Sequence, residues 1–130
     1  MKNLLEHVAK RVFRFTYGSN PKGEGPQIRK KFAYFTPEDY YQASIVSILK
    51  KSDKWLDIGC GRDIFPDNQR LAKILTSRAQ ETVGVDPSPN VRDNKLLDRA
   101  YLGFADSVKE DNYYNLITLR MVAEHVADPD

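Results

Sequence analysis

Trp55-Leu56-Asp57-Ile58-Gly59-Cys60-Gly61 is the stretch that decides the fold of this chain. A short apolar run ends in an acid and is followed by two glycines one residue apart, which is the pattern of a buried strand entering a tight turn. Glycine lets the backbone approach a ligand where a Cβ atom would clash. Because ligands of open parallel sheets bind beyond the carboxyl ends of the strands, the sequence predicts a binding site directly after Ile58.

Strands and helices are expected to alternate downstream of this stretch. A helix opening at Pro66-Asp67 carries Leu71, Ala72, Ile74 and Leu75 on its inward side. Further apolar runs predict strands at 82–85, 100–105 and 114–119, with a short helix at 121–126. Such alternation favours an α/β fold built on a parallel sheet.

The part upstream is expected to be helical with a long loop. Residues 2–15 have the apolar spacing of an amphipathic helix, and 16–27 are rich in glycine and proline. Thr36-Pro37-Glu38-Asp39 is typical of a helix start. The apolar side of that helix is expected to consist of Tyr40, Tyr41, Ile45, Ile48 and Leu49. The helix is expected to end near Lys50-Lys51. The chain is therefore divided into a helical cap and loop at 1–53 and a sheet domain at 54–130.

Composition limits the classes of protein to consider. The chain has 130 residues, of which 41% are hydrophobic and 29% charged, as expected of one soluble domain with a modest core. No apolar run approaches the roughly 18 residues needed to span a membrane. The single cysteine allows no internal disulfide and suits a reducing cytoplasm.

Positive charge is concentrated at the N-terminus. Residues 1–31 hold eight basic residues against two acids, a local net charge of +6, although the whole chain carries only +2. Such an arm could meet nucleic-acid phosphates or an anionic membrane surface. A solvated helix face followed by a basic loop is the simpler interpretation.

Acids follow three of the expected strands: Asp57, Asp86 and Asp106. In a parallel sheet these ends lie along one edge, where carboxylates accept hydrogen bonds from the hydroxyls and amines of a nucleoside. Asp86 lies 25 residues after Gly61, close to the spacing at which an acid binds ribose hydroxyls.

Five segments in order resemble the motifs of a class I S-adenosylmethionine-dependent methyltransferase: Leu56–Gly61, Val83–Ser88, Ala105-Asp106, Tyr114–Leu119 and Ala123–Val126. The last segment is similar to the ubiquinone-biosynthesis-like branch, whose members act on small molecules. The resemblance covers about residues 54–130. It implies a Rossmann-like parallel sheet with flanking helices, preceded by N-terminal cap helices.

The resemblance also implies S-adenosylmethionine as cofactor, S-adenosylhomocysteine as its product, and no metal for cofactor binding. In the family, the first motif holds the methionine part of the cofactor. By the same resemblance, Asp86 binds the ribose hydroxyls and Asp106 meets the adenine amino group. Ten residues match cofactor-binding positions: Asp57, Gly59, Cys60, Gly61, Asp86, Pro87, Ala105, Asp106, Leu119 and Arg120. Cys60 is interpreted as a small buried filler of the turn.

Three departures from the family pattern affect these expectations. Asp63 stands where a third glycine is common, and we expect it to cap the next helix. Asn115 replaces the acid at the start of strand four. The chain stops after the helix that follows 114–119, so the resemblance implies a truncated domain, incomplete at its C-terminal side. Strand four would then be an exposed apolar edge open to self-association.

The sequence therefore favours methyl transfer to a small-molecule acceptor. His125 is a weak candidate for the catalytic base, with pocket lining or packing as the more ordinary role. Two alternatives stay open: a truncated, non-catalytic cofactor-binding fragment, and a nucleic-acid-modifying methyltransferase that uses the basic arm. A nicotinamide-dependent dehydrogenase is disfavoured because Ile64, rather than glycine, stands three residues after Gly61.

Overall fold

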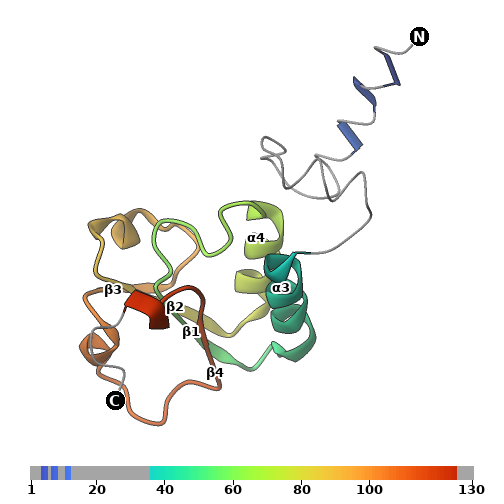
Figure 1. Cartoon of the computed structure of the whole chain (residues 1–130). Coiled ribbons are helices and arrows are strands. Elements are labelled where there is room, and N and C mark those ends of the chain that lie inside the picture. The colour runs from blue at the N-terminus through green and yellow to red at the C-terminus, as the bar shows by residue number, and fades with distance from the viewer. Residues whose placement is uncertain (1–3, 6, 9–10, 13–35, 126–130) are drawn as a thin grey trace. The chain divides into compact units, whose positions relative to one another are not determined.

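The computed structural model describes residues 4–5, 7–8, 11–12 and 36–125 (Figure 1). The six described residues before position 13 are helical, in agreement with the helix expected at 2–15. The loop expected at 16–27 lies outside the described residues, and so do seven of the eight basic residues of the N-terminal arm, all except Arg11. No helix in the described part of the chain is long and apolar enough to cross a membrane.

The chain divides into two compact units, which are described separately. The first holds Met1–Ile48 together with Pro66–Arg70, and the second holds Leu49–Phe65 together with Leu71–Asp130. This division does not test the boundary expected after residue 53, which stays a prediction.

In the first unit, helix α3 (Pro37–Ile48) begins where the sequence predicts. Thr36 is the N-cap: its Oγ1 accepts a hydrogen bond from the Asp39 N–H at 3.4 Å, while the Asp39 carboxylate accepts one from the Thr36 N–H at 2.7 Å. This reciprocal arrangement is a capping box, which satisfies two of the N–H groups that a helix start leaves free.

The buried side of α3 differs from the expected one. Tyr40 and Ile48 are 65% and 51% exposed, so their assignment to the apolar side was wrong. Ile45 is buried as expected, and Gln42 is buried on the same side of the helix, because three residues make nearly one helical turn. The Gln42 amide accepts a hydrogen bond from Asn68 at 2.9 Å and donates one to Glu38 at 3.0 Å, which offsets its burial.

The second unit is built on a four-stranded parallel sheet. Its strands are β1 (Lys54–Ile58), β2 (Glu81–Asp86), β3 (Arg99–Leu102) and β4 (Leu116–Leu119), in the order β3-β2-β1-β4 (Figure 1). Strands β2 and β3 follow β1 on one side of it, and β4 pairs with β1 on its other side. The order therefore reverses between β1 and β4, where ligands of such sheets bind, and the expected Rossmann-like class is confirmed.

The two central strands are buried on both faces, as parallel strands usually are. Leu56, Val83 and Val85 form the core of one face. On the other face of β1, Trp55 is fully buried, and its ring centre lies 6.4 Å from that of Phe65. Strand β4 is an edge strand whose Ile117 and Leu119 are about half exposed, and self-association through it stays a prediction.

Helix α4 (Gln69–Arg78) starts later than expected. It buries Ala72 and Leu75 completely, as expected, but Ile74 is 49% exposed and does not face inward. Because the helix begins at Gln69, Asp63 lies six residues before it and is not its N-cap, so that expectation was wrong. The short 3-10 helix η1 (Pro89–Asp93), which the sequence did not predict, is capped by Ser88.

Strand β3 ends at Leu102, three residues before the expected end. Gly103 stops it, because its φ of +148° leaves the strand conformation. Its N–H still makes a ladder bond to β2, donating to the Asp86 carbonyl at 3.0 Å. Asp106 therefore lies in the 3-10 helix η2 (Ala105–Ser107) rather than at a strand end.

The segment after β4 is shorter than the helix expected at 121–126. It forms the 3-10 helix η3 (Ala123–His125), and residue 126 lies outside the described residues. Met121 has a φ of +52°, a left-handed conformation that a right-handed helix cannot include.

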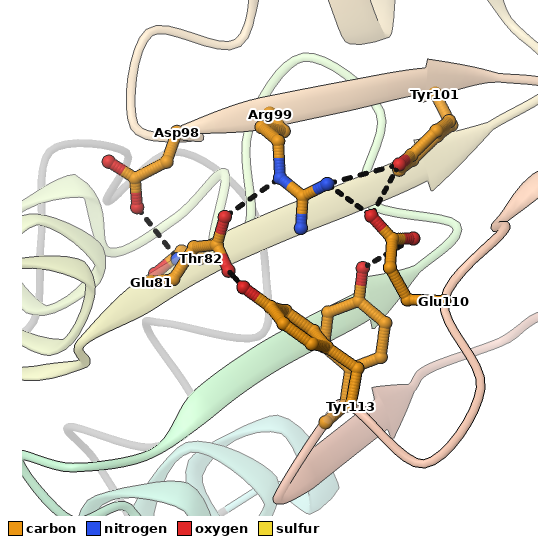
Figure 2. Close-up of polar contacts among 8 residues, drawn as sticks. Glu81, Thr82, Asp98, Arg99, Tyr101, Glu110 and Tyr113 are labelled. Atoms are coloured by element: carbon orange, nitrogen blue, oxygen red, sulfur yellow. Dashed lines mark hydrogen bonds and ion pairs between the residues drawn. The ribbon is translucent and has the colours of Figure 1, made fainter.

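A cluster of polar side chains, here called the Arg99 cluster, forms around the amino ends of β2 and β3 (Figure 2). It consists of Glu81, Arg99, Tyr101, Glu110, Tyr113 and Tyr114. Arg99 Nε lies 2.7 Å from Glu81, and Arg99 Nη1 is ion-paired with Glu110. The Tyr101 hydroxyl donates to Glu110 at 2.8 Å. The cluster thus fastens the segment before β4 to β2 and β3.

Hydrogen bonds in this cluster change the acidity of both carboxyl groups. Those from Arg99 and then Tyr101 lower the pKa of Glu110 to about 2. Desolvation opposes the effect at Glu81, but bonds from Tyr113 and Arg99 still lower its pKa.

Glu110→Gln is expected to weaken the dependence of stability on pH. The folded pKa of Glu110 lies below the ordinary value of about 4.3, so its contribution is complete above that value and is lost as pH falls towards 2. The free energy of unfolding, measured with urea between pH 6 and 2, should fall less steeply in Glu110→Gln than in the wild type. Asp111→Asn removes the same charge at an exposed neighbour and is the control. Equal slopes for Glu110→Gln and the wild type would contradict the prediction.

Candidate functional site at the carboxyl edge of the sheet

The turn after β1 is held by the carboxyl end of β2. The Gly59 N–H donates to the Val85 carbonyl at 2.8 Å, and the Gly61 N–H donates to Asp86 Oδ2 at 2.9 Å. Both glycines have positive φ values, +74° and +53°, which residues with a Cβ atom rarely adopt. The pair of glycines predicted from the sequence is therefore required by the backbone of the turn.

Val122, which follows β4, packs against this turn. A Cβ atom added to Gly59 would clash with a methyl group of Val122. Sequence analysis missed Val122, because nothing in its local sequence indicates which turn it meets. It also missed Asn94, whose side chain donates to the Gly61 carbonyl at 3.3 Å.

Asp86 is the last residue of β2 and is fixed by two backbone donors. Its Oδ1 accepts the Ser88 N–H at 2.7 Å, and its Oδ2 accepts the Gly61 N–H. An ionised carboxylate has about four acceptor positions, so each oxygen keeps one for a ligand. The carboxylate is thus oriented in advance while still able to accept hydrogen bonds from hydroxyl groups.

Asp57 lies one residue before the end of β1 and is only 5% exposed. Its Oδ1 accepts a hydrogen bond from the Thr118 hydroxyl at 2.7 Å, and Thr118 Oγ1 accepts one from the Trp55 indole N–H at 2.7 Å. Burial raises the pKa of Asp57 to about 7; the Thr118 hydrogen bond and Arg120 oppose the rise, and Asp86 adds to it. A buried carboxyl group with a raised pKa at a strand end is typical of a functional site.

Cys60 is buried between these two acids. Desolvation raises the pKa of its thiol to about 12, with the charges of Asp57 and Asp86 contributing. The thiol is therefore neutral at physiological pH and is not a nucleophile. Its sulfur fills the space left by Gly84, where an added Cβ atom would clash with it. The side chain is a filler of the turn, as the sequence predicts.

The other expected site residues lie on either side of this centre. Ala105 and Asp106 are exposed in η2, beyond β3, and Pro87 is exposed directly after β2. Leu119 ends β4 on the opposite side of β1, with Arg120 after it, and His125 is exposed in η3. Asp57, Gly59, Gly61 and Asp86 are gathered around the ends of β1 and β2, with Ala105 and Asp106 after β3 and Leu119 and Arg120 after β4.

The chemistry of this centre suits a ligand that carries both hydroxyl groups and a positive charge. Two carboxyl groups with unused acceptor positions flank a glycine turn that brings backbone close to the ligand. Among the described residues, no group of three or more His, Cys, Asp or Glu side chains is placed to hold a metal ion.

Comparison with known proteins identifies one family. A family model described as a methyltransferase domain matches residues 26–130, which include α3 and the whole sheet. No curated protein and no solved structure gives a significant match.

Gly59→Ala is expected to destabilise the second unit by roughly 1–2 kcal/mol, the cost of a left-handed backbone for a residue with a Cβ atom. The clash with Val122 adds to this cost. Urea unfolding of Gly59→Ala, Val122→Ala and the double variant forms a double-mutant cycle. Gly59→Ala should cost less in the Val122→Ala background. An equal cost in both backgrounds would show that Val122 does not restrict Gly59.

Proposed function

Since the chain belongs to the methyltransferase domain family, we propose that it transfers the methyl group of S-adenosylmethionine to a small-molecule acceptor. The family and the order of the parallel strands make it a class I methyltransferase. One observation supports the choice of cofactor most strongly. Asp57 and Asp86 stand on either side of the glycine turn, each oriented by hydrogen bonds and each with acceptor positions to spare.

The residues of the carboxyl edge fit the parts of this cofactor. Asp86 would accept hydrogen bonds from both ribose hydroxyls, and the turn at 59–61 would admit the methionine part close to the backbone. Asp57, when ionised, would attract the ammonium group. The adenine would lie towards Ala105 and Asp106, and the cofactor's carboxylate towards Leu119 and Arg120.

When bound, S-adenosylmethionine supplies an electrophilic methyl group on a sulfonium centre. The protein's own task is then to hold the acceptor in line with that methyl group and to exclude water. An oxygen acceptor must also lose a proton, and His125 in η3 is the candidate base, because imidazole is the side chain that most often serves as a general base. A neutral amine acceptor would need only positioning.

The domain organisation follows from this proposal. Residues 54–130 form the Rossmann-like methyltransferase part and bind the cofactor, while residues 1–53 form an N-terminal helical cap and loop. The family match spans residues 26–130 and so also includes part of the segment before β1.

Asp86→Ala is expected to weaken the binding of S-adenosylhomocysteine about 100-fold, because two hydrogen bonds to a charged acceptor are lost. Isothermal titration calorimetry at pH 8 measures the change. Asp67→Ala, which removes an exposed acid before α4, is the matched control and should bind like the wild type. If Asp86→Ala retains wild-type affinity, Asp86 is not the ribose-binding acid.

Methyl transfer itself is expected with a small-molecule acceptor. The chain is incubated with cofactor carrying a radioactive methyl group and with panels of phenols, amines, carboxylic acids, RNA and DNA, and the label in each product is counted. Transfer to a small molecule supports the proposal. Label in nucleic acid would favour the alternative that uses the basic arm. Binding of cofactor without any transfer would favour the non-catalytic alternative.

A further inference from the structure

We propose that Thr118 and Trp55 are positioning residues for Asp57: their buried chain of two hydrogen bonds favours the carboxylate form and leaves one oxygen for the cofactor's ammonium group. Cofactor binding is then linked to pH. This inference rests on the proposed function, because it takes the cofactor's ammonium group as the partner of Asp57.

The chain of hydrogen bonds crosses from β1 to β4. Asp57 is in register with Thr118, and Trp55 lies two residues earlier on the same face of β1. The Trp55 indole nitrogen, the Thr118 oxygen and Asp57 Oδ1 are linked by two hydrogen bonds of 2.7 Å each. All three residues are buried, with 0%, 7% and 5% of their surfaces exposed.

The direction of this chain favours the carboxylate. An indole N–H only donates, so Thr118 Oγ1 must be its acceptor. The hydroxyl proton is then free to donate to Asp57 Oδ1 at 2.7 Å, since its other acceptor, the Leu56 carbonyl, is 3.5 Å away. If Asp57 were protonated at Oδ1, the hydroxyl would accept from both groups with its two lone pairs, and its own proton would have only the Leu56 carbonyl at 3.5 Å as acceptor. Trp55 therefore orients the Thr118 hydroxyl towards an ionised Asp57.

The second oxygen of Asp57 provides an independent indication of a ligand. Within the part of the chain that the structure describes, Asp57 Oδ2 accepts no hydrogen bond, although the side chain is buried. This oxygen is not fully enclosed, because among the described residues the fully buried side-chain oxygen without a partner is Thr82 Oγ1, so a ligand can reach Asp57 Oδ2. An ammonium group provides three donors and a positive charge, which suits this position.

The balance of charges around Asp57 brings its titration close to neutral pH. Burial favours the protonated form of Asp57. From the β4 side, the hydrogen bond from Thr118 and the positive charge of Arg120 favour the ionised form. From the β2 side, the negative charge of Asp86 favours protonation, and the Cys60 thiol is neutral. Because an ammonium group binds the ionised form, affinity should rise as pH increases through this range and fall as pH decreases.

The first test measures Asp57 in the ligand-free protein. The carbon-13 shift of its carboxyl group is followed from pH 5 to 9 in the wild type, Thr118→Val, Thr118→Ser and Trp55→Phe. Thr118→Val keeps the shape but removes the hydroxyl, so the titration midpoint should rise by about one pH unit. Thr118→Ser retains the hydroxyl and should titrate like the wild type. Trp55→Phe removes the indole donor and should give a smaller rise in the same direction.

The second test measures cofactor affinity with S-adenosylhomocysteine by calorimetry between pH 6 and 8.5. Wild-type affinity should fall as pH is lowered, and Thr118→Val should bind about fivefold more weakly than Thr118→Ser at pH 7, because a smaller fraction of its Asp57 is ionised. A pH-independent affinity, or a carboxyl titration in Thr118→Val identical to that of the wild type, would overturn this inference. Both results would leave the proposed function intact. Absence of S-adenosylhomocysteine binding to the wild type at every pH would instead refute the proposed function.

Discussion

Two hydrogen bonds between the turn after β1 and the end of β2 determine the geometry on which the site depends. One joins the Gly59 N–H to the Val85 carbonyl, and the other joins the Gly61 N–H to Asp86. The second bond uses a side chain as acceptor, so the acid proposed to bind ribose also helps to close the turn. A substitution of Asp86 would therefore affect both the proposed ribose contact and the closure of the turn.

The position of Asp57 has a cost in stability. Its folded pKa of about 7 lies above the ordinary value of about 3.9, so the folded state binds more protons than the unfolded state between these values. Stability therefore decreases as pH rises from about 4 to 7, and at neutral pH the buried acid destabilises the fold. The hydrogen bond from Thr118 offsets part of this cost. Functional groups are often retained at such a cost.

The sequence predicts those features that local pattern determines. The strand and glycine turn at 54–61, the second strand ending at Asp86 and the cap at Thr36 all depend on neighbouring residues, and all are present. Features that depend on distant contacts were missed or misplaced. Strand β3 ends early where Gly103 takes a positive φ, which the apolar run 100–105 does not indicate, and the Thr118–Asp57 contact requires the register of β1 with β4. A threonine within the apolar run 116–119 was the one available signal of that contact.

Carboxyl groups at the two edges of the sheet occupy opposite environments. Near its amino edge, Glu81 and Glu110 are paired with Arg99 and tyrosine hydroxyls, and their pKa values are lowered. At its carboxyl edge, Asp57 has a single neutral hydroxyl as hydrogen-bond donor, and its pKa is raised. A carboxylate already neutralised by arginine gains little from a cationic ligand, whereas a buried one without a direct cationic partner gains much. The distribution of countercharge thus supports the proposal that the carboxyl edge binds the ligand, while the paired groups near the amino edge stabilise the fold.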